Sequence, residues 1–221
     1  MILKNVFPVI LSFMLICSLQ AQQKVTPPSD NSNRNMNNNK DYKGLMVEGH
    51  LGLTGSSIDF VNTDDYIYDF EISGTGIRIG GKLGYRTSRT FMLNVGLDIY
   101  VIPKPLVGDM DMHSLTVTCV NLLGGTRLYL SDNFFLGANL TYGQVGITNS
   151  ETDYSGTTEG GLGYNFSIGN TWWAGNSFGI ELEAFMQGLS TTDKDEGYNI
   201  GIAPSDVTAL FYGISIGFVL K

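Results

Sequence analysis

After residue 21 this 221-residue chain lacks any apolar run long enough for a membrane helix, which takes about 20 predominantly apolar residues. Charge is scarce too, at 15% of residues against about 25% in an average soluble domain. Cysteine and histidine are limited to Cys17, Cys119, His50 and His113. These shortages exclude a helical membrane protein, a disulfide-rich scaffold and a zinc site of the Cys/His type. No phosphate-cradling glycine loop or basic nucleic-acid patch is present either.

What the chain does contain is a strict alternation of apolar with small or polar residues. The last segment places six apolar residues on one face: Leu210, Tyr212, Ile214, Ile216, Phe218 and Leu220. Its other face carries small residues such as Gly213, Ser215 and Gly217. Strand side chains point alternately to opposite faces. A soluble sandwich would show its second face to water and carry Lys, Glu and Thr there, so the small residues indicate a crowded barrel interior.

Eight segments of this kind follow one another. We expect strands at about residues 45–55, 76–85, 91–101, 113–130, 134–143, 161–169, 178–188 and 207–220. In the fourth segment Val117 and Cys119 lie on one parity and Leu122 and Leu128 on the other, which predicts a β-bulge near residues 119–121. Short connections alternate with longer ones, and an even strand count returns both termini to one side. The sequence therefore predicts an all-β, eight-stranded antiparallel up-and-down transmembrane β-barrel over residues 44–221.

The amino-terminal residues predict export. Lys4 precedes an apolar stretch that ends near small residues, so we interpret residues 1–21 as a removed signal peptide. A lipoprotein acylated at Cys17 is the alternative, and the bulky Ile16 speaks against it. Residues 22–43 are rich in Asn and poor in apolar residues, which predicts a flexible periplasmic tail. With Cys17 removed, Cys119 would have no intramolecular disulfide partner.

Charged residues on the inward parity form the first candidate site. These are Glu48, Arg78, Lys82, Asp98, Arg127, Glu181 and Glu183. Side chains can fill an eight-stranded barrel, and buried charges require partners. We expect a mutual salt-bridge network that plugs the interior. The alternative is that the same residues line a narrow path for ions, protons or small solutes.

The longer connections form an acidic rim. The acids expected on the surface loops are Asp64, Asp65, Asp69, Asp109, Asp111, Asp193, Asp195 and Glu196. Solvated surface charge is the simplest interpretation, although carboxylates near lipopolysaccharide phosphates could also hold Ca²⁺ or Mg²⁺. Loop tyrosines such as Tyr66, Tyr154 and Tyr198 suit either a surface partner or an outer aromatic girdle.

Aromatic residues collect near the short connections and predict a membrane-interface girdle. The residues concerned are Tyr85, Phe91, Phe134, Phe135, Trp172, Trp173 and Phe178, with Phe218 in the last strand. Paired tryptophans are common in soluble cores, but these flank the same kind of turn as the other rings. The predicted girdle therefore lies at the rim opposite the acidic loops.

Together, the signal peptide, the eight alternating segments and residues 212–218 resemble the bacterial outer-membrane β-barrel family that includes OmpX and the membrane domain of OmpA. The resemblance covers about residues 44–221. It implies an outer-membrane location with a periplasmic amino terminus, contact with lipid and lipopolysaccharide, and insertion by the barrel-assembly machinery. Family members usually end in an aromatic residue, whereas here Phe218 is followed by Val219, Leu220 and Lys221.

Catalysis is not expected from these residues. His113 and Ser114 are adjacent, so in a strand they would point to opposite faces and could not act as base and nucleophile. His50 is expected inside the barrel in a polar network. We therefore predict a non-enzymatic protein without a cofactor, structural or adhesive at the cell surface, with a narrow channel as the alternative. A secreted lipocalin-like barrel would need apolar residues on the inward face.

Overall fold

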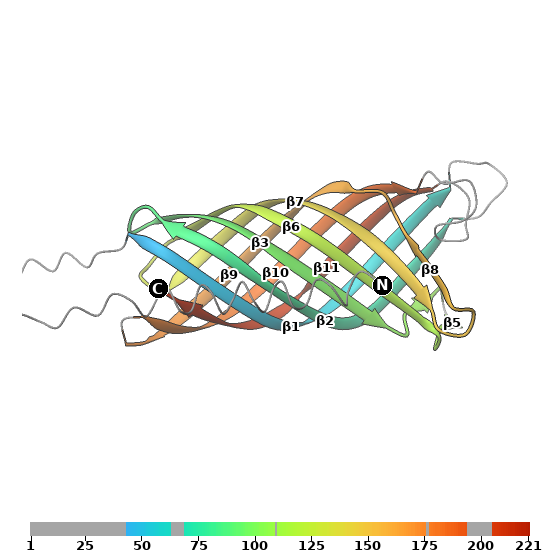
Figure 1. Ribbon diagram of the computed structural model, residues 1–221, viewed down its shortest axis with the longest axis horizontal. Coiled ribbons are helices and arrows are strands. Elements are labelled where there is room, and N and C mark those ends of the chain that lie inside the picture. The colour runs from blue at the N-terminus through green and yellow to red at the C-terminus, as the bar shows by residue number, and fades with distance from the viewer. Residues whose placement is uncertain (1–42, 63–68, 109, 176, 194–204) are drawn as a thin grey trace, which may run out of the picture. The chain divides into compact units, whose positions relative to one another are not determined.

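The computed structural model describes residues 43–62, 69–108, 110–175, 177–193 and 205–221 (Figure 1). The predicted signal peptide and nearly all of the predicted tail fall on residues 1–42 and lie outside the described residues. In the described part of the chain, no helix is long and apolar enough to cross a membrane.

Eight long strands make up most of this part of the chain. They are β1 (Gly44–Asn62), β2 (Phe70–Arg86), β3 (Phe91–Pro103), β6 (Leu115–Tyr129), β7 (Phe134–Asn149), β9 (Gly161–Ala174), β10 (Phe178–Asp193) and β11 (Ser205–Leu220). Three short strands lie in the connections: β4 (Leu106–Val107), β5 (Met110–Asp111) and β8 (Tyr154–Thr157). The long strands have 13 to 19 residues, more than the about 9–11 that a tilted membrane strand needs.

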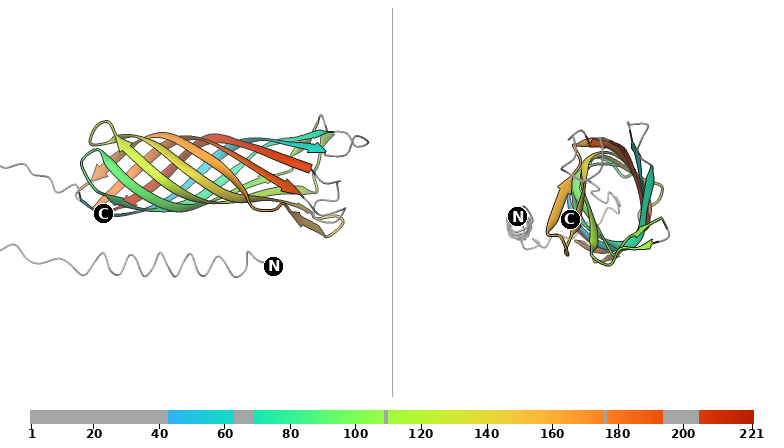
Figure 2. Two further views of the ribbon diagram at one scale, coloured as in Figure 1. Left: turned by 90° about the horizontal axis from the view of Figure 1, so that it is seen from above. Right: turned by 90° about the vertical axis from the view of Figure 1, so that its right-hand side faces the viewer.

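The long strands close into a barrel. Each pairs antiparallel with its neighbours in the order β1, β11, β10, β9, β7, β6, β3, β2, and β2 pairs again with β1. The end-on view in Figure 2 shows the resulting ring of strands. The prediction of an eight-stranded antiparallel up-and-down barrel is confirmed.

The exterior of this barrel is apolar along every long strand. Leu53, Leu140 and Leu162 are the most exposed of these side chains, at 67%, 76% and 74%. Equivalent outward positions hold Ile79, Val95, Leu122, Ile180 and Ile214. Such a surface would be unfavourable in water, and it matches the apolar band of a transmembrane barrel.

The predicted bulge in β6 is wrong. The strand keeps one register with β3, where Tyr100 is opposite Cys119 and Asp98 is opposite Asn121, and it pairs without interruption with β7. Val117 and Cys119 are fully buried inside the barrel, whereas Leu122 is exposed outside. Apolar residues therefore occupy both parities because the barrel has an apolar layer inside as well as lipid-facing residues outside.

The two ends of the barrel differ in their connections. We call the end with the β2–β3, β6–β7 and β9–β10 connections the short-turn rim, and the opposite end the long-loop rim (left and right in Figure 1). In the first two short turns a serine hydroxyl, of Ser88 or Ser131, accepts hydrogen bonds from the backbone N–H groups two and three residues later. These side chains stabilise the tight turns locally.

Candidate functional site

The barrel interior has three layers. Near the long-loop rim lies an apolar cluster, the loop-side cluster: Ile58, Phe60, Ile72, Tyr100, Ile102, Val117, Cys119, Val145, Ile147, Phe185, Leu189, Val207, Ala209 and Phe211. A smaller turn-side cluster lies near the short-turn rim: Met46, Met92, Tyr129, Phe135 and Val219. Between them along the same strands lies the charged cluster: Glu48, His50, Arg78, Lys82, Asp98, Arg127, Glu181 and Glu183. Polar residues thus occupy a layer bounded by apolar residues on both sides.

Aromatic rings fill much of the loop-side cluster. The rings of Tyr100 and Phe211 stack with centroids 4.5 Å apart, and those of Phe60 and Phe70 stack at the same distance. Cys119 is a free, buried cysteine in this cluster. The interior at this level is packed with apolar side chains, whereas the sequence pattern predicts mostly small and polar residues on the inward face.

The turn-side cluster is closed by an arginine. The Arg86 guanidinium lies 3.8 Å from the centroid of the Tyr129 ring and donates hydrogen bonds to the carbonyl oxygens of Ser88 and Arg89 in the turn. Arg86 is 1% exposed. Arg86 was not among the predicted site residues, although its parity with Arg78 and Lys82 in the same strand marks it as inward.

Of the aromatic residues predicted to form the girdle, those on the outward parity face outward, and their place at a membrane interface stays a prediction. Tyr85, Trp172, Phe178 and Phe218 are exposed, and Phe91 and Phe134 are half-buried on outward positions of their strands. The prediction is wrong for Trp173, which packs against the turn-side cluster, and for Phe135, which belongs to that cluster. Each follows an outward residue directly, so strand alternation turns it inward.

Arg127 of β6 links three strands across the charged cluster. Its Nη1 donates to Glu181 Oε2 at 2.9 Å, and its Nη2 donates to Glu181 Oε1 at 3.0 Å and to Glu48 Oε2 at 2.8 Å. Glu183 Oε2 lies 3.5 Å from the same Nη2. Glu48 belongs to β1 and both other acids to β10, so this guanidinium joins strands that are not neighbours in the barrel.

Arg78 and Lys82 of β2 make the second half of the network. Arg78 donates through Nη2 to Asp98 Oδ2 at 2.6 Å and through Nη1 to Glu183 Oε1 at 2.8 Å. Lys82 Nζ donates to Glu183 Oε2 at 2.9 Å and lies 3.5 Å from Glu48 Oε1. All seven charged residues expected on the inward face therefore lie in one buried cluster of ion pairs.

His50 completes the charged cluster. Its Nε2 lies 2.7 Å from Asp98 Oδ1 and its Nδ1 lies 3.3 Å from Glu48 Oε1. His113, by contrast, is exposed in the turn before β6. The two histidines are therefore in separate parts of the barrel.

Three acids of the charged cluster lie as close together as the ligands of a bound cation. One carboxylate oxygen from each of Glu48, Glu181 and Glu183 lies within 4.8 Å of the others. The Arg127 guanidinium is hydrogen-bonded to Glu48 and Glu181, and the Lys82 ammonium to Glu183. Protein cations already neutralise these carboxylates, so the geometry is that of an ion-pair network.

The opposite side of the interior is lined by uncharged polar residues, which we call the amide wall: Asn121, Asn139, Thr141, Asn165 and Ser167 of β6, β7 and β9. Asn139 Nδ2 donates to Asn165 Oδ1 at 3.0 Å. Each of the five side chains has one buried polar atom without a hydrogen bond to a described residue. Buried polar atoms of this kind normally bond to ordered water.

The loop acids are described in part. Asp69 and Asp111 are exposed. Asp193 ends β10, but its side chain lies outside what the structure describes. The same holds for five whole residues: Asp64, Asp65, Asp109, Asp195 and Glu196. Solvated surface charge stays the prediction for the long-loop rim, with cation binding as the alternative.

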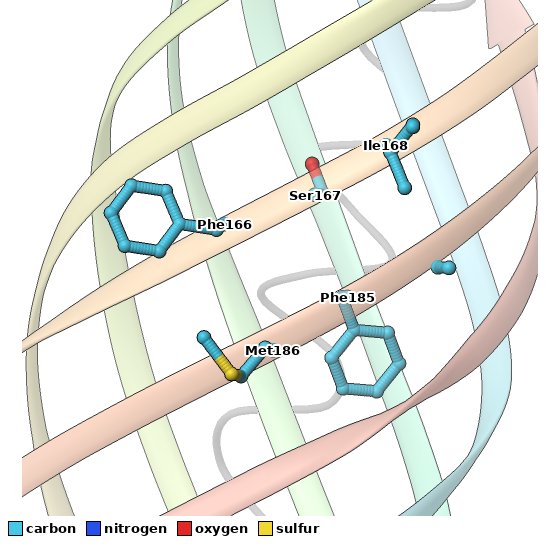
Figure 3. Close-up of a pocket in the computed structure, with 6 residues that line it drawn as sticks. Phe166, Ser167, Ile168, Phe185 and Met186 are labelled. Atoms are coloured by element: carbon cyan, nitrogen blue, oxygen red, sulfur yellow. The ribbon is translucent and has the colours of Figure 1, made fainter.

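A groove of about 300 Å³ lies between β9 and β10 (Figure 3). Phe166, Ile168 and Met186, which line it, are exposed on the outer face at 51%, 46% and 42%. The small Ala184 lies between these larger side chains and leaves the depression. The groove has the apolar character of the surrounding lipid-facing surface.

No protein-family model matches the chain, and no curated protein matches it in sequence. Among solved structures it is similar to OprG from Pseudomonas aeruginosa (11% identity, TM-score 0.48), Neisserial surface protein A, NspA (13%, 0.46), and the outer-membrane protease OmpT from Escherichia coli (9%, 0.43). Each match covers 80% of this chain and 96% of the other.

Proposed function

We propose that this chain is a non-enzymatic outer-membrane barrel whose interior is closed by its own side chains and whose work lies at the cell surface, in a structural or adhesive role. The observation that carries the proposal is the position of Arg127. Its guanidinium bonds to Glu48 and Glu181 from two other parts of the barrel wall, at 2.8 to 3.0 Å. A cross-barrel ion pair of this kind occupies the space that a pore would need.

The apolar clusters support closure as well. The loop-side cluster lies on one side of the charged cluster and the turn-side cluster on the other. An ion would have to leave water and pass two layers of buried apolar side chains, which is costly. Ion pairs alone could open transiently, whereas the two apolar layers oppose entry even then.

The outward surface supports the membrane location. Lipid would contact the belt that includes Leu53, Leu140 and Leu162, and the barrel-assembly machinery would insert the strands. Val47 near the start of β1 is opposite Leu220 at the end of β11, so both lie at the short-turn rim. We place this rim in the periplasm and the acidic long-loop rim outside, toward lipopolysaccharide.

Neither histidine suits a catalytic role. Both ring nitrogens of His50 face carboxylates inside the barrel, and no serine, threonine or cysteine among the described residues is hydrogen-bonded to it. His113 lies in a surface turn, where no described nucleophile is hydrogen-bonded to its ring.

Planar-bilayer recording tests closure directly. The closed barrel should give no unitary current steps, either as the unaltered protein or as Glu181→Gln. A matched control is Glu151→Gln, which removes an exposed acid outside the interior. Regular unitary steps whose size changes with Glu181→Gln, and stays unchanged with Glu151→Gln, would overturn the proposal.

Conduction of water or small polar solutes is the second candidate, because the amide wall has spare hydrogen-bonding capacity. A path along Asn121, Asn139 and Asn165 would still meet the loop-side cluster. Osmotic swelling of vesicles that contain the barrel distinguishes the two functions: swelling in a small sugar supports the path, and an unchanged rate supports closure.

Two further measurements test location and surface role. Gel mobility of the outer-membrane fraction, with and without boiling, should show a heat-dependent shift if the barrel is folded in that membrane. Protease treatment of intact cells should then cut the long-loop rim. A soluble protein with no shift, or loops protected in intact cells, would contradict the proposed placement.

A further inference from the structure

His50 lies between two carboxylates inside the barrel. Its Nε2 is 2.7 Å from Asp98 Oδ1 on β3, and its Nδ1 is 3.3 Å from Glu48 Oε1 on its own strand. The side chains of His50, Glu48 and Asp98 are at most 4% exposed. Nδ1 and Glu48 Oε1 form no hydrogen bond with any described residue, each other included, so the contact between them is one of charge and proximity. Each of the two ring nitrogens therefore faces a buried carboxylate rather than solvent.

Two glycines make room for this ring. His50 is opposite Gly80 of β2 and opposite Gly217 of β11. A Cβ atom at Gly80 would collide with Asp98 Oδ1 and His50 Nε2, the two atoms of the short contact. A Cβ atom at Gly217 would lie 3.0 Å from the Gly49 carbonyl oxygen and 3.3 Å from His50 Cβ, and none of its three nearest atoms belongs to Asp98 or to the ring. The contact between His50 and Asp98 thus depends on the absence of a side chain at Gly80.

The chemistry of the ring decides its protonation. A neutral imidazole has one N–H donor and one nitrogen lone pair, so either tautomer would point a lone pair at a carboxylate oxygen. The imidazolium donates from both nitrogens and is attracted by both anions. We infer that His50 is a buried proton-binding site, held as an imidazolium that bridges Glu48 and Asp98 within the barrel.

The remaining charges around the ring are shared with the same two acids. Arg78 of β2 donates to the other oxygen of Asp98, and Arg127 of β6 donates to the other oxygen of Glu48. Lys82 of β2 lies 3.5 Å from Glu48 Oε1 and bonds to Glu183 of β10, while Glu181 of β10 bonds to Arg127. Arg78, Lys82 and Arg127 oppose a positive ring, whereas carboxylate oxygens lie 2.7 and 3.3 Å from its two nitrogens. On β11 the neighbouring inward residues, Gly217 and Ser215, carry no charge.

This protonation has a consequence for the barrel. The attraction between the ring and its two acids exists while the imidazolium persists, and it is lost when rising pH removes the proton. While the imidazolium persists, both nitrogens carry protons, so neither can accept a proton from a neighbour. His50 is therefore a fixed charge of the network and no proton relay. The inference rests on local geometry and does not depend on the surface role proposed above.

Nuclear magnetic resonance of the refolded barrel in lipid nanodiscs tests the inference, with ¹⁵N in the histidine rings. The chain has two histidines, His50 and His113, so the exposed ring of His113 provides an internal reference. At pH 8 a free histidine side chain, which titrates near pH 6.5, is about 97% neutral. We expect the His50 ring to show two protonated nitrogens at pH 8. A neutral-ring signal for His50 at pH 8 would overturn the inference.

Two glycine variants sharpen the test. Gly80→Ala inserts a methyl group between Asp98 and the ring, so the His50 signal should become that of a neutral ring at pH 8. Gly217→Ala is the matched control, since it adds the same methyl group on the other side and should keep the two-proton signal. If Gly80→Ala does not refold, the spectrum of the unaltered barrel still decides the matter. An unchanged His50 signal in folded Gly80→Ala would show that Asp98 does not hold the proton.

Discussion

The charged cluster and the amide wall face each other inside one barrel but use polar atoms differently. In the charged cluster Arg78 and Arg127 each bond to two carboxylates, and the acids are shared among several cations. On the amide wall the one side-chain bond between its members joins Asn139 to Asn165, and other buried atoms form no hydrogen bond with the described part of the chain. The difference teaches that buried polar groups on the two sides do not stabilise the barrel equally. Removing a member of the charged cluster leaves a buried charge without its partner, whereas water can take up the hydrogen bonds lost on the amide wall.

Arg127→Met should have the largest effect on that contrast. It removes the cation shared by Glu48 and Glu181 and leaves their buried carboxylates short of a partner, which costs about 3–5 kcal/mol of unfolding free energy. Urea unfolding of the barrel in lipid vesicles measures the loss. A change below about 1 kcal/mol would mean that the network rearranges freely, and would weaken the idea of a fixed plug.

Gln187→Leu should rank second. Gln187 Oε1 accepts the Tyr100 hydroxyl at 2.9 Å, and without it the buried hydroxyl keeps one long contact, to Asp98 Oδ2 at 3.5 Å. An unsatisfied buried group costs about 1–3 kcal/mol. Gln144→Leu on the exposed outer face is the control, and lipid should tolerate it. The same unfolding assay compares both variants. Equal losses of unfolding free energy would show that Gln187 inside the barrel contributes no more to stability than Gln144 outside.

Asn139→Ala should have a smaller effect. It removes the bond to Asn165 Oδ1, and a hydrogen bond contributes about 0.5–1.5 kcal/mol net. Water can take over at this wall because polar atoms there already lack a hydrogen bond to any residue that the structure describes. Unfolding in urea gives the value. A loss as large as that of Arg127→Met would show that the two sides of the interior stabilise the barrel equally.

Arg89→Ala at the short-turn rim should have the smallest effect. Arg89 Nε lies 3.2 Å from Asp132 Oδ1, and the two side chains are 64% and 39% exposed. A surface pair of this kind contributes about 0–1 kcal/mol and is screened by salt. At low salt the unfolding free energies of the variant and the unaltered barrel should differ slightly. At 1 M salt the two free energies should agree. A difference that persists at high salt would indicate a role for Arg89 beyond this ion pair.

The strands and their faces were accessible from sequence alone. Period-two alternation predicted that Glu48, Arg78 and Asp98 face inward and that Leu51, Ile79 and Val95 face outward, and the burial of each agrees. The prediction depended on one local rule, because alternation is a property of a strand by itself. The same rule marks Arg86, Phe135 and Trp173 as inward, yet the first was overlooked and the aromatic pair was assigned to the girdle by its proximity to a turn.

The loop-side cluster was missed for a physical reason. Composition suggested that the inward face is small and polar, but Val117, Cys119 and Phe211 face inward and are fully buried. An apolar residue on the inward parity looks the same in sequence as a shift in register, which is why a bulge was expected in β6. Only the continuous pairing of β6 with β3 and β7 shows that no residue is inserted.

What the sequence determined by itself was the class of fold, the approximate strands and the inward charges, because each follows from residues within one segment. What the tertiary structure decided was which charges meet. Arg127 contacts Glu48 and Glu181, 79 and 54 residues away, and His50 reaches Asp98 over a glycine. Such partners depend on how eight strands are staggered when the barrel closes, since side chains from separate strands meet across the interior only after closure has fixed their heights.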